Sequence, residues 1–134
     1  MPGTFRCTLV TPESQVLDEE VTHVTVPAWD GQIGFLPGRA PLLAKLGYGM
    51  MRMDLAQGGR RFFYIGGGFA QMKDDRLTVL TEEAQPPESI DPAEAEAALK
   101  EAQARVAGNE QEAKVRDRDR ARARALVAAA RHAH

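Results

Sequence analysis

The residue types that most often act in catalysis or metal binding are few and scattered in this chain of 134 residues. The sequence holds three histidines, one cysteine and two serines: His23, His132, His134, Cys7, Ser14 and Ser89. The histidines lack the paired spacing of a zinc site, and neither serine lies in a Gly-x-Ser-x-Gly turn. The cysteine lies in an alternating apolar segment, which favours a buried position, and a lone cysteine fits a reducing compartment. We therefore predict no catalytic residues, no metal site and no enzyme activity.

A run of three glycines, Gly66-Gly67-Gly68, superficially resembles a phosphate-binding loop. It lacks the Lys-Ser/Thr pair that follows in such loops, and it leads into a strand-like segment rather than a helix. Without a helix N-terminus, no array of backbone N–H groups is available to hold an anion. The three glycines instead predict a β-bulge or a close approach between two strands.

Charge is nearly balanced over the whole chain but separated by sign near its C-terminus. Lysine and arginine number 17 against 19 acidic residues, a balance that argues against a dedicated nucleic-acid binder. Residues 88–101 carry five acids and one lysine, whereas residues 114–131 carry seven bases and two acids. Within the basic stretch, arginines occupy every second position: Arg116, Arg118, Arg120, Arg122 and Arg124. On a helix they spread around most of the circumference, so two interpretations stay open: a solvated surface whose arginines pair with Asp117, Asp119 and the acidic first helix, or a surface for an acidic partner.

The first 86 residues have the pattern of a β-domain. Short apolar runs alternate with Gly, Pro and Asp turns, and Val24 and Val26 share one strand face while His23 and Thr25 share the other. Nine strands are predicted: 5–11, 15–17, 21–27, 32–35, 42–46, 49–55, 60–65, 69–73 and 77–80. We therefore predict an N-terminal antiparallel β-sandwich over residues 1–86.

Residues 87–134 instead predict an antiparallel hairpin of two helices. Asp91-Pro92 is a helix start, and Gly108 followed by Asn109 predicts a left-handed cap and an immediate second start. The first apolar stripe comprises Ala95, Ala98, Leu99, Ala102 and Val106, and the second comprises Val115, Ala123, Leu126 and Ala130. Because these stripes are mostly alanine, the seam buries little apolar area, and we expect a marginally stable hairpin that can open.

The densest turn chemistry lies at residues 31–43, Gly-Gln-Ile-Gly-Phe-Leu-Pro-Gly-Arg-Ala-Pro-Leu-Leu. This segment resembles the signature of the epsilon subunit of bacterial and chloroplast F-type ATP synthases. The resemblance continues in order through residues 9–13 (Leu-Val-Thr-Pro-Glu), 49–52 (Gly-Met-Met-Arg), 67–70 (Gly-Gly-Phe-Ala) and 77–81 (Leu-Thr-Val-Leu-Thr). It therefore covers nearly the whole chain, including the helical hairpin.

The resemblance implies a flattened β-sandwich of about ten strands, a two-helix C-terminal domain and a non-catalytic role in the central rotor. The sandwich would bind the gamma subunit and the c-subunit ring, and this binding would help to couple ion flow to ATP synthesis. The helices would restrain ATP hydrolysis by reaching the catalytic alpha and beta subunits, with Arg116, Arg118, Arg120, Arg122 and Arg124 as contacts. The c-ring contacts would be Gln32, Gly38, Arg39, Ala40 and Pro41. The protein would be peripheral, on the cytoplasmic face of the bacterial inner membrane.

Two residues depart from the family pattern. Arg39 stands where the family usually has histidine, and it offers either a charge-assisted hydrogen bond to the c ring or a solvated loop charge. Some members bind ATP through Ile/Leu-Asp-x-x-Arg-Ala, where this chain has Ile90 and Asp91 followed by Glu94 in place of the arginine. A carboxylate at a phosphate-binding position opposes anion binding, so we expect no cofactor and weak or absent ATP binding.

Two rival functions remain open from the sequence. A nucleic-acid-binding β-barrel with an Arg-rich helical tail would need aromatic stacking residues on one strand face, and Phe62, Phe63 and Tyr64 instead alternate faces. An enzyme with an unrecognised carboxylate site would need two carboxyl groups in contrasting environments, and no such pair is evident.

Overall fold

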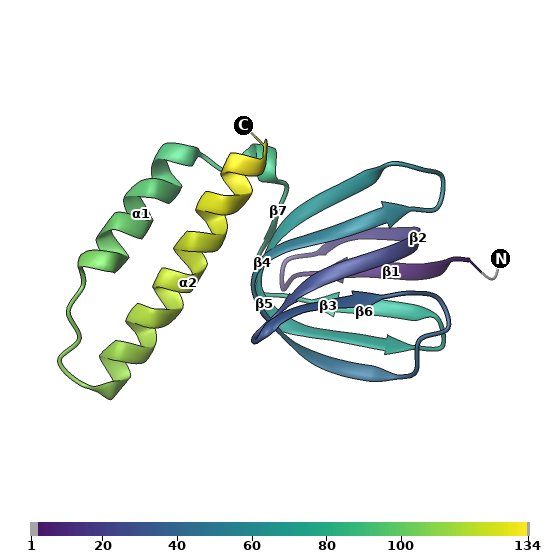
Figure 1. The fold of residues 1–134 in the computed structure, drawn as a ribbon, viewed down its shortest axis with the longest axis horizontal. Coiled ribbons are helices and arrows are strands. Elements are labelled where there is room, and N and C mark those ends of the chain that lie inside the picture. Colours follow the sequence, from purple (N-terminus) through teal and green to yellow (C-terminus); the bar gives the residue numbers. More distant parts are fainter. Residues whose placement is uncertain (1–2, 134) are drawn as a thin grey trace.

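The computed structural model describes residues 3–133, which form a β-domain followed by a helical hairpin (Figure 1). His134 lies outside the described residues. The strands are β1 (Phe5–Val10), β2 (Gln15–Ala28), β3 (Gly31–Phe35), β4 (Leu42–Leu55), β5 (Arg60–Lys73), β6 (Arg76–Leu80) and β7 (Ala84–Gln85). A 3₁₀ turn, η1 (Pro87–Ser89), leads to the helices α1 (Pro92–Ala104) and α2 (Glu110–Ala133).

The strands close on themselves into a flattened β-structure, which confirms the predicted sandwich. They follow the order β1-β6-β5-β4-β2-β3, and an additional pairing of β1 with β2 completes the ring, while β7 pairs with β5. The pairing between β1 and β6 is parallel, which departs from the all-antiparallel prediction. Closure leaves few backbone groups unpaired at strand edges.

Residues 3–133 form seven strands rather than nine or ten, because three predicted pairs of strands are each one continuous strand and the short strand β7 was not predicted. β2, β4 and β5 each run for 14 residues, through positions that the sequence pattern marks as breaks. In β5 the break is Gly66-Gly67-Gly68, where Gly67 and Gly68 have φ of 74° and 105°. A Cβ on Gly68 would lie 1.9 Å from the Leu80 carbonyl oxygen, so the predicted close strand approach is confirmed.

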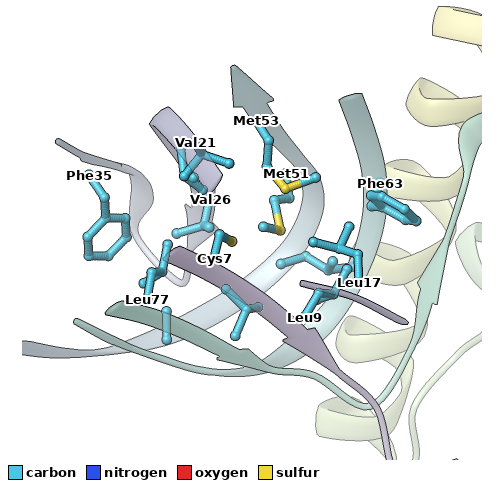
Figure 2. Packing of buried hydrophobic residues seen from close by; sticks show 14 of the residues in the cluster. Cys7, Leu9, Leu17, Val21, Val26, Phe35, Met51, Met53, Phe63 and Leu77 are labelled. Atoms are coloured by element: carbon cyan, nitrogen blue, oxygen red, sulfur yellow. The ribbon is translucent and has the colours of Figure 1, made fainter. Parts of the chain in front are cut away.

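One continuous hydrophobic core fills the sandwich (Figure 2). It takes side chains from all six strands β1 to β6, with Cys7, Phe35, Met51, Met53 and Leu77 among those labelled in the figure. Cys7 is fully buried, and desolvation raises the pKa of its thiol to about 12. The thiol is therefore un-ionised and chemically inert, as its apolar neighbours in the sequence predict.

The hairpin lies against one side of the sandwich, and α2 is the helix between α1 and the strands (Figure 1). The predicted helix starts are correct. The Asp91 carboxylate accepts hydrogen bonds from Ala93 N and Glu94 N, and the Asn109 side chain accepts one from Glu112 N at 2.8 Å. None of the helices within residues 3–133 is long and apolar enough to cross a membrane.

The end of the first helix differs from the prediction. α1 stops at Ala104, and Arg105 has an extended backbone with ψ of 133°, so residues 105–109 form a loop, whereas the sequence predicts that the first helix continues to Gly108. Gly108 does not have a positive φ. Val106 is 87% exposed instead of completing the apolar stripe. The physical reason is a cap supplied from α2, described below.

Candidate functional site at the junction of hairpin and sandwich

A bidentate ion pair joins the helical hairpin to the sandwich. Arg122, on α2, donates from Nε to one carboxylate oxygen of Glu83 at 2.6 Å and from a terminal nitrogen to the other at 2.7 Å. The Tyr64 hydroxyl of β5 lies 3.2 Å from the same carboxylate and donates to it. Paired N–H donors facing a carboxylate give the strongest geometry available to an ion pair.

Glu83 is held in place by the backbone around it. It follows β6 and precedes β7, and its carbonyl accepts hydrogen bonds from Gly66 N at 3.0 Å and from the buried Thr81 hydroxyl at 3.1 Å. The Gly66 N–H also lies 3.2 Å from the Thr81 hydroxyl oxygen. A Cβ on Gly66 would lie 2.8 Å from a Glu83 carboxylate oxygen and 3.0 Å from the Tyr64 hydroxyl. Glycine at position 66 therefore leaves the room that this cluster occupies.

The electrostatics of the cluster favour its charged form. The hydrogen bond from Arg122 lowers the pKa of Glu83, and the same hydrogen bond raises the pKa of Arg122. Burial, followed by the negative charge of Glu83, raises the pKa of Tyr64, so its hydroxyl keeps the proton that it donates. The Arg122 side chain is 40% exposed and that of Glu83 28%, so solvent screens the pair partly but not fully.

A second set of arginine contacts lies within the hairpin. Arg120 donates to the backbone carbonyls of Ala102, Gln103 and Arg105 at 2.9, 2.9 and 3.2 Å, and so caps the carbonyls at and just after the end of α1. Arg105 in turn pairs with Asp119 at 2.7 Å. These contacts stop α1 before Val106 and fix the loop between the helices.

The five arginines that the sequence singled out are thus used in different ways. Arg120 and Arg122 make the contacts above, Arg116 pairs with Asp117 and Arg118 with Asp119, and Arg124 is exposed. In the docked hairpin, the interpretation of arginines paired with Asp117 and Asp119 therefore holds for Arg116 and Arg118, whereas Arg122 pairs with Glu83 of the sandwich rather than with an acid of the hairpin. Their use as contacts for a partner stays a prediction.

A pocket of about 220 Å³ lies between η1, α1 and α2, and it contains the residues of the ATP-motif resemblance. Ile90, Asp91 and Glu94 line it together with Arg122 and Leu126. Asp91 is already engaged as the cap of α1, and the charge of Arg122 is neutralised by Glu83. The pocket therefore presents carboxylates without a free guanidinium to match a phosphate.

The predicted c-ring residues are all exposed, but they do not form one cluster. Gly38, Arg39, Ala40 and Pro41 form the loop after β3, whereas Gln32 lies near the opposite end of that strand, opposite Pro27. The loop is fixed by a hydrogen bond of 2.8 Å from Gly38 N to an Asp75 side-chain oxygen.

Gly38 has a φ of 79°, a conformation that favours glycine. The Arg39 guanidinium lies over the Phe35 ring, 5.4 Å from its centre, so it has a cation–π partner while remaining exposed.

The histidines and carboxylates show no catalytic or metal-binding arrangement among residues 3–133. His23 lies 3.9 Å from Asp54 on the sandwich surface, and the His132 ring lies 4.3 Å from that of Phe62. No group of three or more potential ligands within these residues is placed to hold a metal ion.

Sequence reasoning did not identify Glu83 and Tyr64 as parts of a site. Glu83 sits beside Glu82 and has the local pattern of a solvated turn, and its partner lies 39 residues away along the chain. The glycine run at residues 66–68 was the available sequence signal for this site. It predicted a close approach between strands there, but it did not identify Glu83 as the neighbouring residue.

Comparison with known families and proteins gives consistent matches. Residues 4–87 match the family described as "ATP synthase, Delta/Epsilon chain, beta-sandwich domain". The ATP synthase epsilon chain of Rhodopirellula baltica is 44% identical over 99 residues, which cover 74% of this chain and 77% of that protein. The epsilon chain of Pelotomaculum thermopropionicum is 40% identical over 105 residues, covering 78% of this chain and 77% of that one.

Solved structures extend the likeness to the helices. A chain in the Euglena gracilis mitochondrial ATP synthase OSCP/F1/c-ring structure superposes with a TM-score of 0.86 at 27% identity, covering 97% of this chain and 83% of that one. A chain in the central stalk and c-ring structure of Tetrahymena thermophila mitochondrial ATP synthase has a TM-score of 0.73 at 10% identity, with 96% of each chain covered. At that identity the second likeness concerns the fold alone.

Proposed function

The chain belongs to the ATP synthase delta/epsilon family, and from that premise we propose that it is the epsilon subunit in the central rotor of a bacterial F-type ATP synthase. The observation that carries the proposal is the extent of the structural likeness. The superposition on the Euglena complex runs through sandwich and hairpin together, over 97% of this chain. In this role the subunit couples ion flow to ATP synthesis, and its helices restrain ATP hydrolysis. It performs no chemistry itself.

The gamma subunit is the proposed partner of the apolar part of the sandwich surface. Leu43, Phe69 and Leu80 lie on the adjacent strands β4, β5 and β6, and they are 65%, 50% and 51% exposed. Phe69 is directly opposite Leu80 in the sheet, and Leu43 is diagonal to Phe69 across β4 and β5. We call these three residues the apolar patch. Large apolar side chains gathered on a sheet face are typical of protein interfaces. The apolar patch therefore supports gamma binding by the sandwich, and it gives no information about the hairpin.

The c ring and the catalytic subunits are proposed to bind elsewhere. The loop of Gly38–Pro41 is exposed and conformationally fixed, which suits contact with the polar loops of the c ring, where Arg39 offers a charge-assisted hydrogen bond. The arginines of α2 would reach the alpha and beta subunits only after the hairpin leaves the sandwich, because Arg120 and Arg122 are engaged while it is docked. The subunit would be peripheral to the membrane, on the cytoplasmic face.

ATP binding is proposed to be weak or absent. The support is the composition of the pocket, where Glu94 replaces the arginine of the family motif and Arg122 is already paired with Glu83.

The nucleic-acid alternative is not favoured. Of the exposed large hydrophobic residues within residues 3–133, two are aromatic, Trp29 and Phe69, and they lie on different elements rather than on one stacking face.

The decisive experiment uses a reconstituted catalytic head containing alpha, beta and gamma subunits. We expect the full chain to lower the rate of ATP hydrolysis, and a chain ending at Glu88 to bind gamma but lower the rate less. Equal rates with the two chains would contradict the restraining role of the hairpin. Failure of the full chain to co-purify with gamma would contradict the assignment to the rotor.

A further inference from the structure

The hairpin touches the sandwich through α2 and the segment that leads into α1. α2 lies against β4, β5 and η1, while α1 packs on the far side of α2 (Figure 1). Of the ion pairs within residues 3–133, the pair between Arg122 and Glu83 is the one that joins hairpin and sandwich. A ring contact between His132 and Phe62 also joins α2 to the sandwich.

The apolar part of the junction is modest. Leu126 and Val127 are its largest buried side chains from α2, and the remaining buried residues of that helix are alanines. They meet Tyr64, which is fully buried, and the partly buried Tyr48 and Met50 of β4. Because alanine buries little surface, a polar contact carries a larger share of the docking free energy here than in an ordinary core.

The two helices are held to each other by a separate and larger set of polar contacts. Arg105 pairs with Asp119 at 2.7 Å, Arg120 caps the end of α1, and Arg131 lies 3.0 Å from Glu96. None of these contacts involves the sandwich, so loss of the Arg122–Glu83 pair leaves them intact.

We propose that Arg122, Glu83 and Tyr64 form a latch that holds the hairpin on the sandwich, and that its release lets the hairpin leave as an intact pair of helices. Undocking and the later separation of α1 from α2 are then two steps controlled by different arginines. Arg122 governs the first step, and Arg105 and Arg120 govern the second. The regulatory meaning of the latch rests on the proposed function, but the latch itself is a property of the isolated chain.

The chemistry of the latch makes it reversible. Undocking exposes a guanidinium and a carboxylate that water solvates well, and both are already partly exposed when docked. Their separation therefore has a small free-energy cost compared with breaking a fully buried pair. The Tyr64 hydroxyl holds the Glu83 carboxylate and the Gly66 N–H holds the Glu83 backbone carbonyl, so the pair re-forms with little reorganisation.

The test measures two distances by double electron–electron resonance in the isolated full chain. Spin labels at Gln57→Cys and Ala128→Cys report docking, and labels at Ala97→Cys and Ala128→Cys report the separation of the helices. All three sites are exposed, and the native Cys7 is fully buried. In Glu83→Gln and in Arg122→Gln we expect the ratio of undocked to docked molecules to rise roughly two- to tenfold, with the distance between the helices unchanged.

Matched controls use the same charge changes nearby. Glu82→Gln and Arg124→Gln alter exposed residues outside the latch and outside the contacts between the helices, and they should leave both distances unchanged. The reversed pair Glu83→Lys with Arg122→Glu should recover part of the docking, which separates an ionic latch from a general loss of folding. An unchanged docking distance in Glu83→Gln and Arg122→Gln would overturn the proposal, as would simultaneous separation of the two helices. A shift in docking without any effect on ATP hydrolysis would support the latch and count against the proposed restraint.

Discussion

The Arg120 guanidinium caps the C-terminus of α1 from the neighbouring helix, with its Nε 2.9 Å from the carbonyl oxygen of Ala102. Two further carbonyls, of Gln103 and Arg105, accept from the same side chain. A helix end normally leaves its last carbonyls to water or to its own chain, so here the length of α1 depends on its contact with α2.

Replacement of Arg120 should therefore weaken the hairpin. In Arg120→Gln we expect the free energy of helix unfolding to fall by about 1–2 kcal/mol, because charge-assisted hydrogen bonds to three carbonyls are lost. Thermal melting followed by far-ultraviolet circular dichroism measures this change. Arg124→Gln is the control, since Arg124 is an exposed arginine on the same helix. Equal melting of the two variants would contradict the capping role.

Gly68 should tolerate no side chain, whereas Gly58 should tolerate one at moderate cost. Both have φ near 100°, but a Cβ on Gly68 would overlap the Leu80 carbonyl oxygen and one on Gly58 would meet open space. We expect Gly68→Ala to destabilise the sandwich by about 3 kcal/mol or more, and Gly58→Ala by about 1 kcal/mol. Urea unfolding measures both losses. The loss in Gly58→Ala reports the backbone strain that the two variants share, and the additional loss in Gly68→Ala reports the steric overlap. Similar losses in both would show that the strands can move apart.

The sequence could predict the features that depend on local residue patterns. Alternation of apolar residues and turn chemistry identified the β-domain, and the start of α1 at Asp91 followed from local capping rules. The end of α1 could not be predicted, because its cap comes from Arg120 in another helix. Gly108 had the right local chemistry for a helix end, and the tertiary contact overrode it.

The candidate site was less predictable than the fold for the same reason. The sequence placed Arg122 in a basic stretch, but its spacing from Glu83 follows no local period. The parallel pairing of β1 with β6 likewise joins segments from opposite ends of the β-domain. Contacts of this range are set by the closure of the whole sheet rather than by any short pattern.

Acid should weaken the latch. The Arg122 hydrogen bond holds the pKa of Glu83 below its ordinary value of 4.5, so the carboxylate binds a proton less readily when folded than when unfolded. The stabilisation is therefore fully present above about pH 4.5 and is lost as the pH falls through the lowered pKa. We expect the difference in hairpin stability between the wild type and Glu83→Gln to shrink over that acidic range.

Subtracting the unfolding free energy of Glu83→Gln from that of the wild type removes the contribution of the other acidic residues. Asp18, Asp54 and Asp119 also have lowered pKa values from their arginine partners, and both proteins contain them. Equilibrium unfolding at a series of pH values, followed by helical circular dichroism, gives the two curves. A difference that stayed constant from about pH 7 to pH 3 would show that Glu83 contributes no ionic stabilisation.

Glu94 should determine whether the pocket accepts ATP. The wild-type pocket carries Asp91 and Glu94 beside a guanidinium that Glu83 neutralises, so phosphate binding is electrostatically opposed. We expect isothermal titration calorimetry to give no heat of binding at micromolar ATP for the wild type. Glu94→Arg should produce measurable binding, whereas Glu94→Gln, which only removes the negative charge, should produce less. Clear binding by the wild type would contradict the prediction.

The apolar patch should be required for binding to gamma but not for folding. Phe69 is half exposed on β5, opposite Leu80, so Phe69→Glu places a carboxylate in the patch without disturbing the core. We expect its affinity for gamma to fall at least about tenfold, because the interface would bury an unpaired charge, while the free energy of unfolding changes by about 0.5 kcal/mol or less. Gln57→Glu is the matched control, since it adds the same charge at an exposed position in the turn between β4 and β5, outside the patch. Surface plasmon resonance against immobilised gamma gives the affinities, and equal binding by the two variants would exclude the patch as the gamma interface.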